Sequence, residues 1–128
     1  MSTRPHKGKL FLIHWDAAEA EEKAVPLRAD GWDVTLESDG GATAYLGIRK
    51  TNPDVIVIHL SRLPAHGSDT AHALRSTQVT RDIPIVFVGG QGQGLKEAKM
   101  AVPGAAYTSA ADLPKVLERL FSGRGQRF

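Results

Sequence analysis

Two unbroken apolar runs constrain the fold of this chain more than any other feature. One lies in PDVIVIHLS, residues 53–61, and the other in IPIVFVGG, residues 83–90, and each is entered through a proline. Both runs are rich in β-branched residues, which favour strands. A strand that is apolar at every position is buried on both faces, as in a parallel sheet with helices on each side. The sequence therefore predicts an α/β fold.

The remaining segments alternate between strand and helix. Three more strands are predicted, at KLFLIH (9–14), WDVTLES (32–38) and AAYTS (105–109). Helices are expected at residues 16–31, 39–52, 68–76, about 95–103 and 113–121. Five strand–helix units with right-handed crossovers predict a flavodoxin-like, doubly wound sheet of five parallel strands in the order 2-1-3-4-5. The first and last helices are expected on one face and the other three on the opposite face.

The first and last helices carry the clearest local signals. Asp16 is placed to cap the first helix, Pro26 is expected to kink or weaken it, and Gly31 to end it. Ala17, Ala20 and Ala24 mark one face of that helix. The last helix has apolar residues at helical spacing, namely Leu113, Val116, Leu117, Leu120 and Phe121.

Length and composition predict one soluble domain. The chain has 128 residues, of which 41% are hydrophobic and 23% charged, and it is long enough to bury a core. The predicted domain covers residues 9–122, between basic tails at 1–8 and 123–128. The absence of cysteine excludes disulfides, thiolate catalysis and cysteine-bound zinc. No apolar stretch approaches the ~20 residues of a membrane span, and the N-terminus has no signal-peptide run, so a cytoplasmic protein is expected.

The distribution of charge argues against a nucleic-acid partner. Of the 16 Lys and Arg residues, five lie close to the ends of the chain, namely Arg4, Lys7, Lys9, Arg124 and Arg127. The remaining 11 stand against 14 acidic residues. A protein that binds nucleic acid would be expected to concentrate its basic residues on one element of the fold.

Histidines stand where this fold usually places its function. Open α/β sheets bind ligands beyond the carboxyl ends of the strands at which strand order reverses, here the first and third strands. The first strand ends in His14, followed by Trp15 and Asp16, and the third ends in His59. These four residues are therefore the candidate pocket.

The chain resembles response-regulator receiver domains over nearly its full length. NPDVIVIHLSRLPAHG is similar to the family's third strand and loop, where a Pro-Asp pair opens an apolar strand that ends in the phosphorylated aspartate. Gly67 stands at the usual distance in that loop, whereas Pro64 is displaced by one residue. RADGWDV resembles the entry to the second strand, and RDIPIVFVGG resembles the fourth strand.

Carried over by this resemblance, the chemistry of the receiver pocket is missing. The phosphoacceptor aspartate falls on His59, and the acidic pair that holds magnesium falls on His14 and Trp15, with only Asp16 nearby. The switch positions fall on Gly89, Tyr107 and Ala110, where the family has a Ser or Thr, an aromatic residue and a lysine. Aspartyl phosphorylation needs a carboxylate nucleophile, further carboxylates for magnesium and a cation. The resemblance therefore implies a pseudo-receiver that is not an enzyme and uses no cofactor or metal.

Other uses of the same residues stay open. An imidazole is a competent nucleophile, so His59 could accept a phosphoryl group, or it could be structural. His14, Asp16 and His59 could bind zinc or nickel, or the histidines could be semi-exposed groups that are hydrogen-bonded at the strand ends. Trp15 could fill the pocket or pack under the first helix.

The glycine run GGQGQG, residues 89–94, suggests a phosphate-binding loop. A dinucleotide fingerprint, however, follows the first strand and has a third glycine where Leu95 stands here. A flexible loop is the simpler interpretation, and an anionic ligand at the pocket mouth, which these small residues keep open, stays as the alternative. These glycines, with Pro103 beyond them, predict that the helix at about 95–103 is the least regular element.

The resemblance also implies that the domain works through protein contacts. Receivers bind partners and self-associate through a face built from the fourth helix, fifth strand and fifth helix. Here that face would contain Lys96, Lys99, Tyr107, Lys115 and Arg119. We therefore expect a phosphorylation-independent module of phosphorelay-type signalling that contacts a kinase or an output protein, with a homodimer as a second assembly.

A small-molecule binder is the alternative function. The strands at 53–61 and 83–90 also look like those of cobalamin-binding domains, which share the flavodoxin-like order. Those domains take their cobalt ligand from an Asp-x-His-x-x-Gly motif, whereas HWDAAE, residues 14–19, has neither that spacing nor the glycine. No nucleophile elbow or P-loop supports a hydrolase or a transferase.

Overall fold

One parallel sheet forms the centre of the molecule. The computed structural model describes residues 8–14, 16–38, 41–60, 82–89, 96, 99–100 and 105–125. The strands are β1 (Gly8–Ile13), β2 (Trp32–Glu37), β3 (Val55–His59), β4 (Ile85–Val88) and β5 (Ala106–Thr108). All strand pairs are parallel and the order is β2-β1-β3-β4-β5. The predicted strand order is confirmed.

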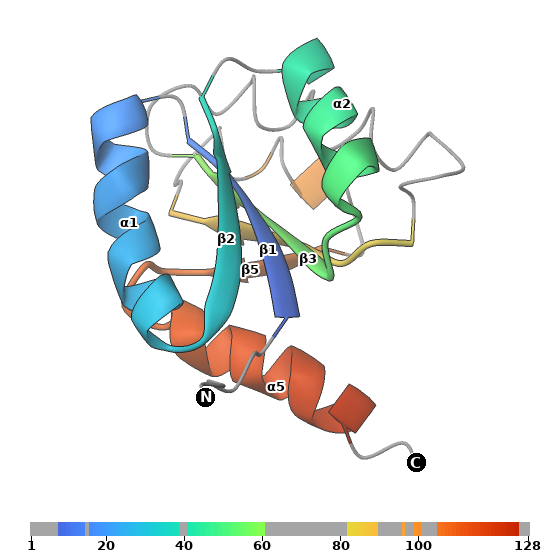
Figure 1. Cartoon of the computed structure of the whole chain (residues 1–128). Coiled ribbons are helices and arrows are strands. Elements are labelled where there is room, and N and C mark those ends of the chain that lie inside the picture. The colour runs from blue at the N-terminus through green and yellow to red at the C-terminus, as the bar shows by residue number, and fades with distance from the viewer. Residues whose placement is uncertain are drawn as a thin grey trace, which may run out of the picture.

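Helices cover both faces of this sheet (Figure 1). α1 (Ala17–Ala29) and α5 (Leu113–Gly125) pack on one face, and α2 (Gly41–Thr51) packs on the other. This is the partition predicted for these three helices. The expected helix at 68–76 lies outside the described residues. Of the expected helix at about 95–103, only Lys96, Lys99 and Met100 are described, so its predicted irregularity lies mostly outside them as well. In the parts of the chain that are described, no helix is long and apolar enough to cross a membrane.

Side-chain alternation along the central strands creates two apolar cores. The core under α1 and α5 contains Leu10, Leu12, Val55 and Val57, and the core under α2 contains Phe11, Ile13, Ile56 and Ile58. Successive side chains of a strand point to opposite faces, so an unbroken apolar run serves both cores at once. Each of these side chains stabilises the fold by ~1.5–3 kcal/mol when it is fully buried. The apolar runs of β1 and β3 are therefore explained by the two layers of helices.

The first turn of α1 confirms the predicted cap. Oδ1 of Asp16 accepts a hydrogen bond from the backbone N–H of Glu19 at 3.0 Å. Pro26 lies inside the helix, which nevertheless continues to Ala29, and Gly31 then adopts a left-handed φ of 105°. The buried face of α1 consists of Ala20, Ala24 and Leu27, whereas Ala17 is exposed. The predicted face is therefore correct except in its first residue, because Ala17 lies at the helix start, beyond the sheet contact.

Candidate functional site

The register of the sheet places His14 and His59 side by side. Ile13 of β1 pairs with Ile58 of β3, and each histidine is the next residue along its own strand. Adjacent strands in a sheet are ~4.8 Å apart, and the centroids of the two imidazole rings are 4.8 Å apart, with the ring planes inclined by 39°. Because side chains alternate, both rings point to the face that α1 covers.

Both histidines are buried, which corrects the expectation of semi-exposed rings at the strand ends. His14 is 1% exposed and His59 is 4% exposed. The physical reason is that α1 begins directly after β1 and passes over the ends of both strands. The rings are therefore removed from water although they follow the last apolar residues of their strands.

His14 connects the end of β1 to the start of α1. Its Nδ1 accepts a hydrogen bond from the backbone N–H of Asp16 at 3.1 Å, and its Nε2 lies 3.3 Å from Oε1 of Glu19. A ring nitrogen that accepts a hydrogen bond carries no proton, so this arrangement puts the proton of the neutral ring on Nε2. That N–H then faces the Glu19 carboxylate.

His59 has a less polar environment. Its Nε2 is buried and has no hydrogen-bond partner among the described residues. The pKa of His59 is lowered from 6.5 to about 4, first by burial, then by the neighbouring His14 and by the ammonium group of Lys23, while the carboxylate of Glu19 acts in the opposite direction. His59 is therefore a neutral imidazole at pH 7. An unsatisfied buried polar group costs ~1–3 kcal/mol, so this nitrogen is available to a ligand that can reach it.

The structure does not assemble the metal site that His14, Asp16 and His59 suggested. Across the described ranges, no three His, Asp or Glu side chains are placed to hold a metal ion. The carboxylate of Asp16 points to the first turn of α1, where it caps the N–H of Glu19. Helix capping thus fixes the direction in which this carboxylate points. Trp15 lies outside the described residues, so neither interpretation of its side chain is tested.

The switch positions named by resemblance lie around β4 and β5. Gly89 follows β4 with a φ of 78°, and its N–H donates to the carbonyl of Thr108 at 3.0 Å. A left-handed φ favours glycine, so a hydroxyl-bearing residue would be strained at this position. Tyr107 stacks on Phe87 with ring centroids 5.3 Å apart, and Ala110 is exposed in the turn after β5.

The residues of the predicted interaction face lie on two different sides of the sheet. Lys96, Lys99, Lys115 and Arg119 are exposed, and Tyr107 is half-buried. The ammonium of Lys99 lies 5.6 Å from the centroid of the Tyr107 ring, a cation–π contact. Tyr107 packs against the core under α2, whereas α5, which carries Lys115 and Arg119, packs on the opposite face. The structure therefore brings Lys99 and Tyr107 together and places the two α5 residues on the other side of β5.

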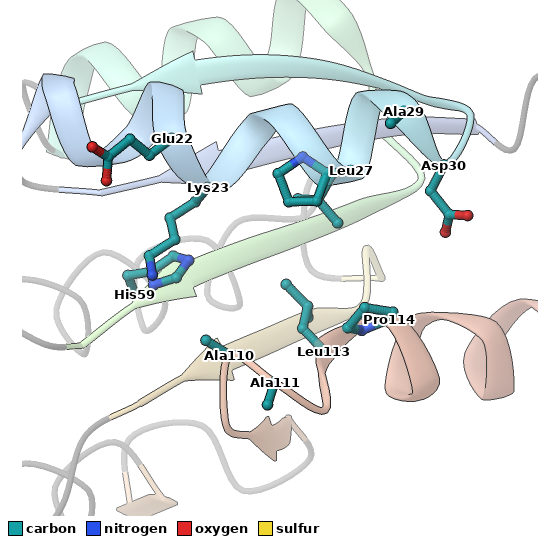
Figure 2. Close-up of a pocket in the computed structure, with 11 residues that line it drawn as sticks. Glu22, Lys23, Leu27, Ala29, Asp30, His59, Ala110, Ala111, Leu113 and Pro114 are labelled. Atoms are coloured by element: carbon teal, nitrogen blue, oxygen red, sulfur yellow. The ribbon is translucent and has the colours of Figure 1, made fainter.

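Sequence reasoning missed a cavity between α1 and the turn that precedes α5 (Figure 2). Its volume is about 760 Å³, and it reaches His59. Pro26 and Leu27 of α1 line one side, and Ala110 and Leu113 line the other. The two small residues Ala110 and Ala111 before α5 were the available signal, because short side chains at a turn leave space between two helices.

Comparisons with known proteins agree with this fold. No family model matches the chain. The probable transcriptional regulatory protein TcrX of Mycobacterium tuberculosis is 37% identical over 67 residues, which cover 52% of this chain and 28% of that protein. The match thus spans little more than a quarter of the relative.

Solved receiver domains superpose over most of the chain. The receiver domain of the sensor histidine kinase PA1611 from Pseudomonas aeruginosa has a TM-score of 0.72 at 23% identity, covering 88% of this chain and 95% of that one. A putative response regulator from Chloroflexus aurantiacus has a TM-score of 0.75 at 21% identity, with coverages of 93% and 99%. The chemotaxis protein CheY4 of Vibrio cholerae has a TM-score of 0.71 at 21% identity, with coverages of 87% and 96%. The chain has the fold of a receiver domain.

Proposed function

We propose that this chain is a receiver-like module of bacterial phosphorelay-type signalling that acts through protein contacts, independently of phosphorylation. The receiver fold and the partial match to a transcriptional regulatory protein support the signalling role. The role further implies a cytoplasmic protein whose partner is a signalling kinase or an output protein.

The observation that carries the proposal is the chemistry at the end of β3. In the receiver resemblance this position holds the phosphoacceptor aspartate, and the end of β1 holds the magnesium ligands. Here His59 is a buried neutral imidazole, His14 is engaged with Glu19, and the Asp16 carboxylate caps α1. None of these three side chains offers a free carboxylate that could attack a phosphodonor or bind magnesium.

Intact-mass measurement tests the independence from phosphorylation. After incubation with acetyl phosphate and magnesium, we expect the mass of the protein to stay unchanged. A gain of one phosphoryl group would contradict the proposal, and its mapping to His59 would identify a histidine phosphocarrier instead.

The contact between Lys99 and Tyr107 is the proposed centre of the partner surface. An exposed ammonium beside a half-buried aromatic ring combines charge with apolar area, which is the composition favoured at interface hot spots. A homodimer through the same surface is the second assembly that we propose.

Co-purification from the source cell followed by NMR shift mapping tests this surface. We expect the shifts caused by the captured partner to centre on Tyr107. The Lys99→Ala change should weaken binding, and Lys50→Ala, an exposed lysine on α2, should not. Shifts that avoid β5, or equal effects of the two lysine changes, would argue for another surface.

A further inference from the structure

The cavity between α1 and the turn before α5 combines an apolar interior with the buried imidazole of His59 and with three charged side chains, Lys23, Glu22 and Asp30. Its volume of about 760 Å³ lies in the range of ~300–1,000 Å³ that is usual for sites of small organic ligands. It opens on the face of the sheet that α1 and α5 cover, away from the Lys99–Tyr107 contact.

Apolar side chains from two elements form the body of this cavity. Leu27 of α1 stands on one side, and Leu113 and Pro114 of α5 on the other (Figure 2). Pro26 of α1 also lines the cavity. Pro26 also has no N–H, so the carbonyl of Glu22, four residues earlier, lacks its helical donor. An apolar group held between the two helices would remove the apolar side chains on both walls from water, which favours binding.

Polar groups converge at one end of the cavity. Nε2 of His59 is buried and lacks a hydrogen-bond partner among the described residues, although His59 lines the cavity. In Figure 2 the side chain of Lys23 extends from α1 toward His59, whereas the carboxylates of Glu22 and Asp30 point away from it. An acidic group at this end would pair with the Lys23 ammonium and, with the neutral ring of His59 protonated on Nε2, accept a hydrogen bond from it.

We propose that this cavity binds a small amphipathic carboxylic acid, with its carboxylate at Lys23 and His59 and its apolar body between α1 and the start of α5. The site includes His59, but the proposal does not depend on the proposed signalling function, because it is argued from the cavity and its lining. Because it joins α1 to the turn after β5, the bound acid holds together two elements that are distant in sequence.

An NMR titration with three matched probes tests the proposal. Naphthaleneacetate supplies the apolar body and the carboxylate, naphthaleneacetamide keeps the body without the charge, and acetate keeps the charge without the body. We expect saturable shifts with naphthaleneacetate at the backbone amides of Leu27, Ala111 and Leu113. The amide should bind about tenfold more weakly, the usual loss for a charge-assisted hydrogen bond, and acetate should not saturate.

Two variants and one control locate the site. Lys23→Gln should weaken naphthaleneacetate binding about tenfold, whereas Lys50→Gln on α2 should leave it unchanged. Ala111→Trp, a change at an exposed turn that lines the cavity, should abolish binding with the fold retained in circular dichroism. The proposal is overturned if naphthaleneacetate does not saturate, if acid and amide bind equally, or if Lys23→Gln binds like the wild type. If Ala111→Trp does not fold, the proposal is tested by comparing naphthaleneacetate binding to Lys23→Gln and Lys50→Gln.

Discussion

His14 and His59 occupy equivalent places on neighbouring strands, one residue beyond a pair of partnered isoleucines. The sequence predicted that both stand at strand ends and that these strands are neighbours. It did not predict their burial, because burial depends on how α1 packs over the strand ends. The capping role of Asp16 was predicted from its residue type, but not that capping would remove it from a metal site.

At the residue scale, His59 should make the stability of the fold depend on pH. The unfolded chain binds a proton on this ring below its ordinary pKa of 6.5, whereas the folded chain binds it only below about 4. Between these values the unfolded state holds more protons, so stability is fully present above pH 6.5 and is lost as the pH falls toward 4. We expect a loss of about 3 kcal/mol at pH 4, measured by urea unfolding between pH 7.5 and 4.

The His59→Leu variant is the matched control for this prediction. Leucine has a similar volume and does not titrate, and the carboxylates that also destabilise proteins in acid are common to both chains. The variant should therefore be less sensitive to acid than the wild type between pH 6.5 and 4. Identical pH profiles for the two proteins would show that His59 does not carry the effect.

At the scale of elements, strong periodic patterns predicted where helices and strands lie in the sequence. They did not predict well the residues at which these elements begin and end. In α5, Leu113 and Leu117 are buried and Val116 and Leu120 are partly buried, as the helical spacing predicted. β3 begins only at Val55, two residues later than predicted, where Asn52 has a left-handed φ of 50° and Pro53 follows. The cavity between α1 and α5 could not be predicted, because it depends on how two helices meet rather than on a pattern within either.

The cap of α1 is testable by substitution at Asp16. Asp16→Ala removes the acceptor for the Glu19 N–H and should destabilise the protein by about 1 kcal/mol, measured by urea unfolding at pH 7. Asp16→Asn keeps a side-chain oxygen and should remain close to the wild type. If both variants lost the same stability, the charge of Asp16 rather than its hydrogen bond would be responsible.

At the scale of the whole molecule, the fold and the chemistry of the site depend on different residues. The two apolar cores and the parallel sheet require only the spacing of apolar residues, and that spacing predicted the flavodoxin-like sheet order. The chemistry of a receiver instead needs particular side chains at the ends of several strands, and each of them can change without loss of the sheet. The same separation explains why solved receivers superpose on this chain at only 21–23% identity in the three comparisons above.

This separation predicts that one substitution will not restore a receiver site. In His59→Asp the new carboxylate would lie in a buried position beside His14, with Asp16 still capping α1. Magnesium prefers several oxygen ligands in near-octahedral geometry, so a single carboxylate should not hold it.

A magnesium ion at a hundredfold excess over its Kd would stabilise the fold by ~2.7 kcal/mol and raise Tm by several degrees. We expect no magnesium-dependent change in Tm for the wild type or for His59→Asp. The triple variant His14→Asp, Trp15→Asp and His59→Asp supplies the carboxylates that the receiver resemblance assigns to these positions, and it should gain that response. A magnesium-dependent rise in Tm for His59→Asp alone would show that the native pocket already contains the remaining ligands, and would contradict the pseudo-receiver proposal.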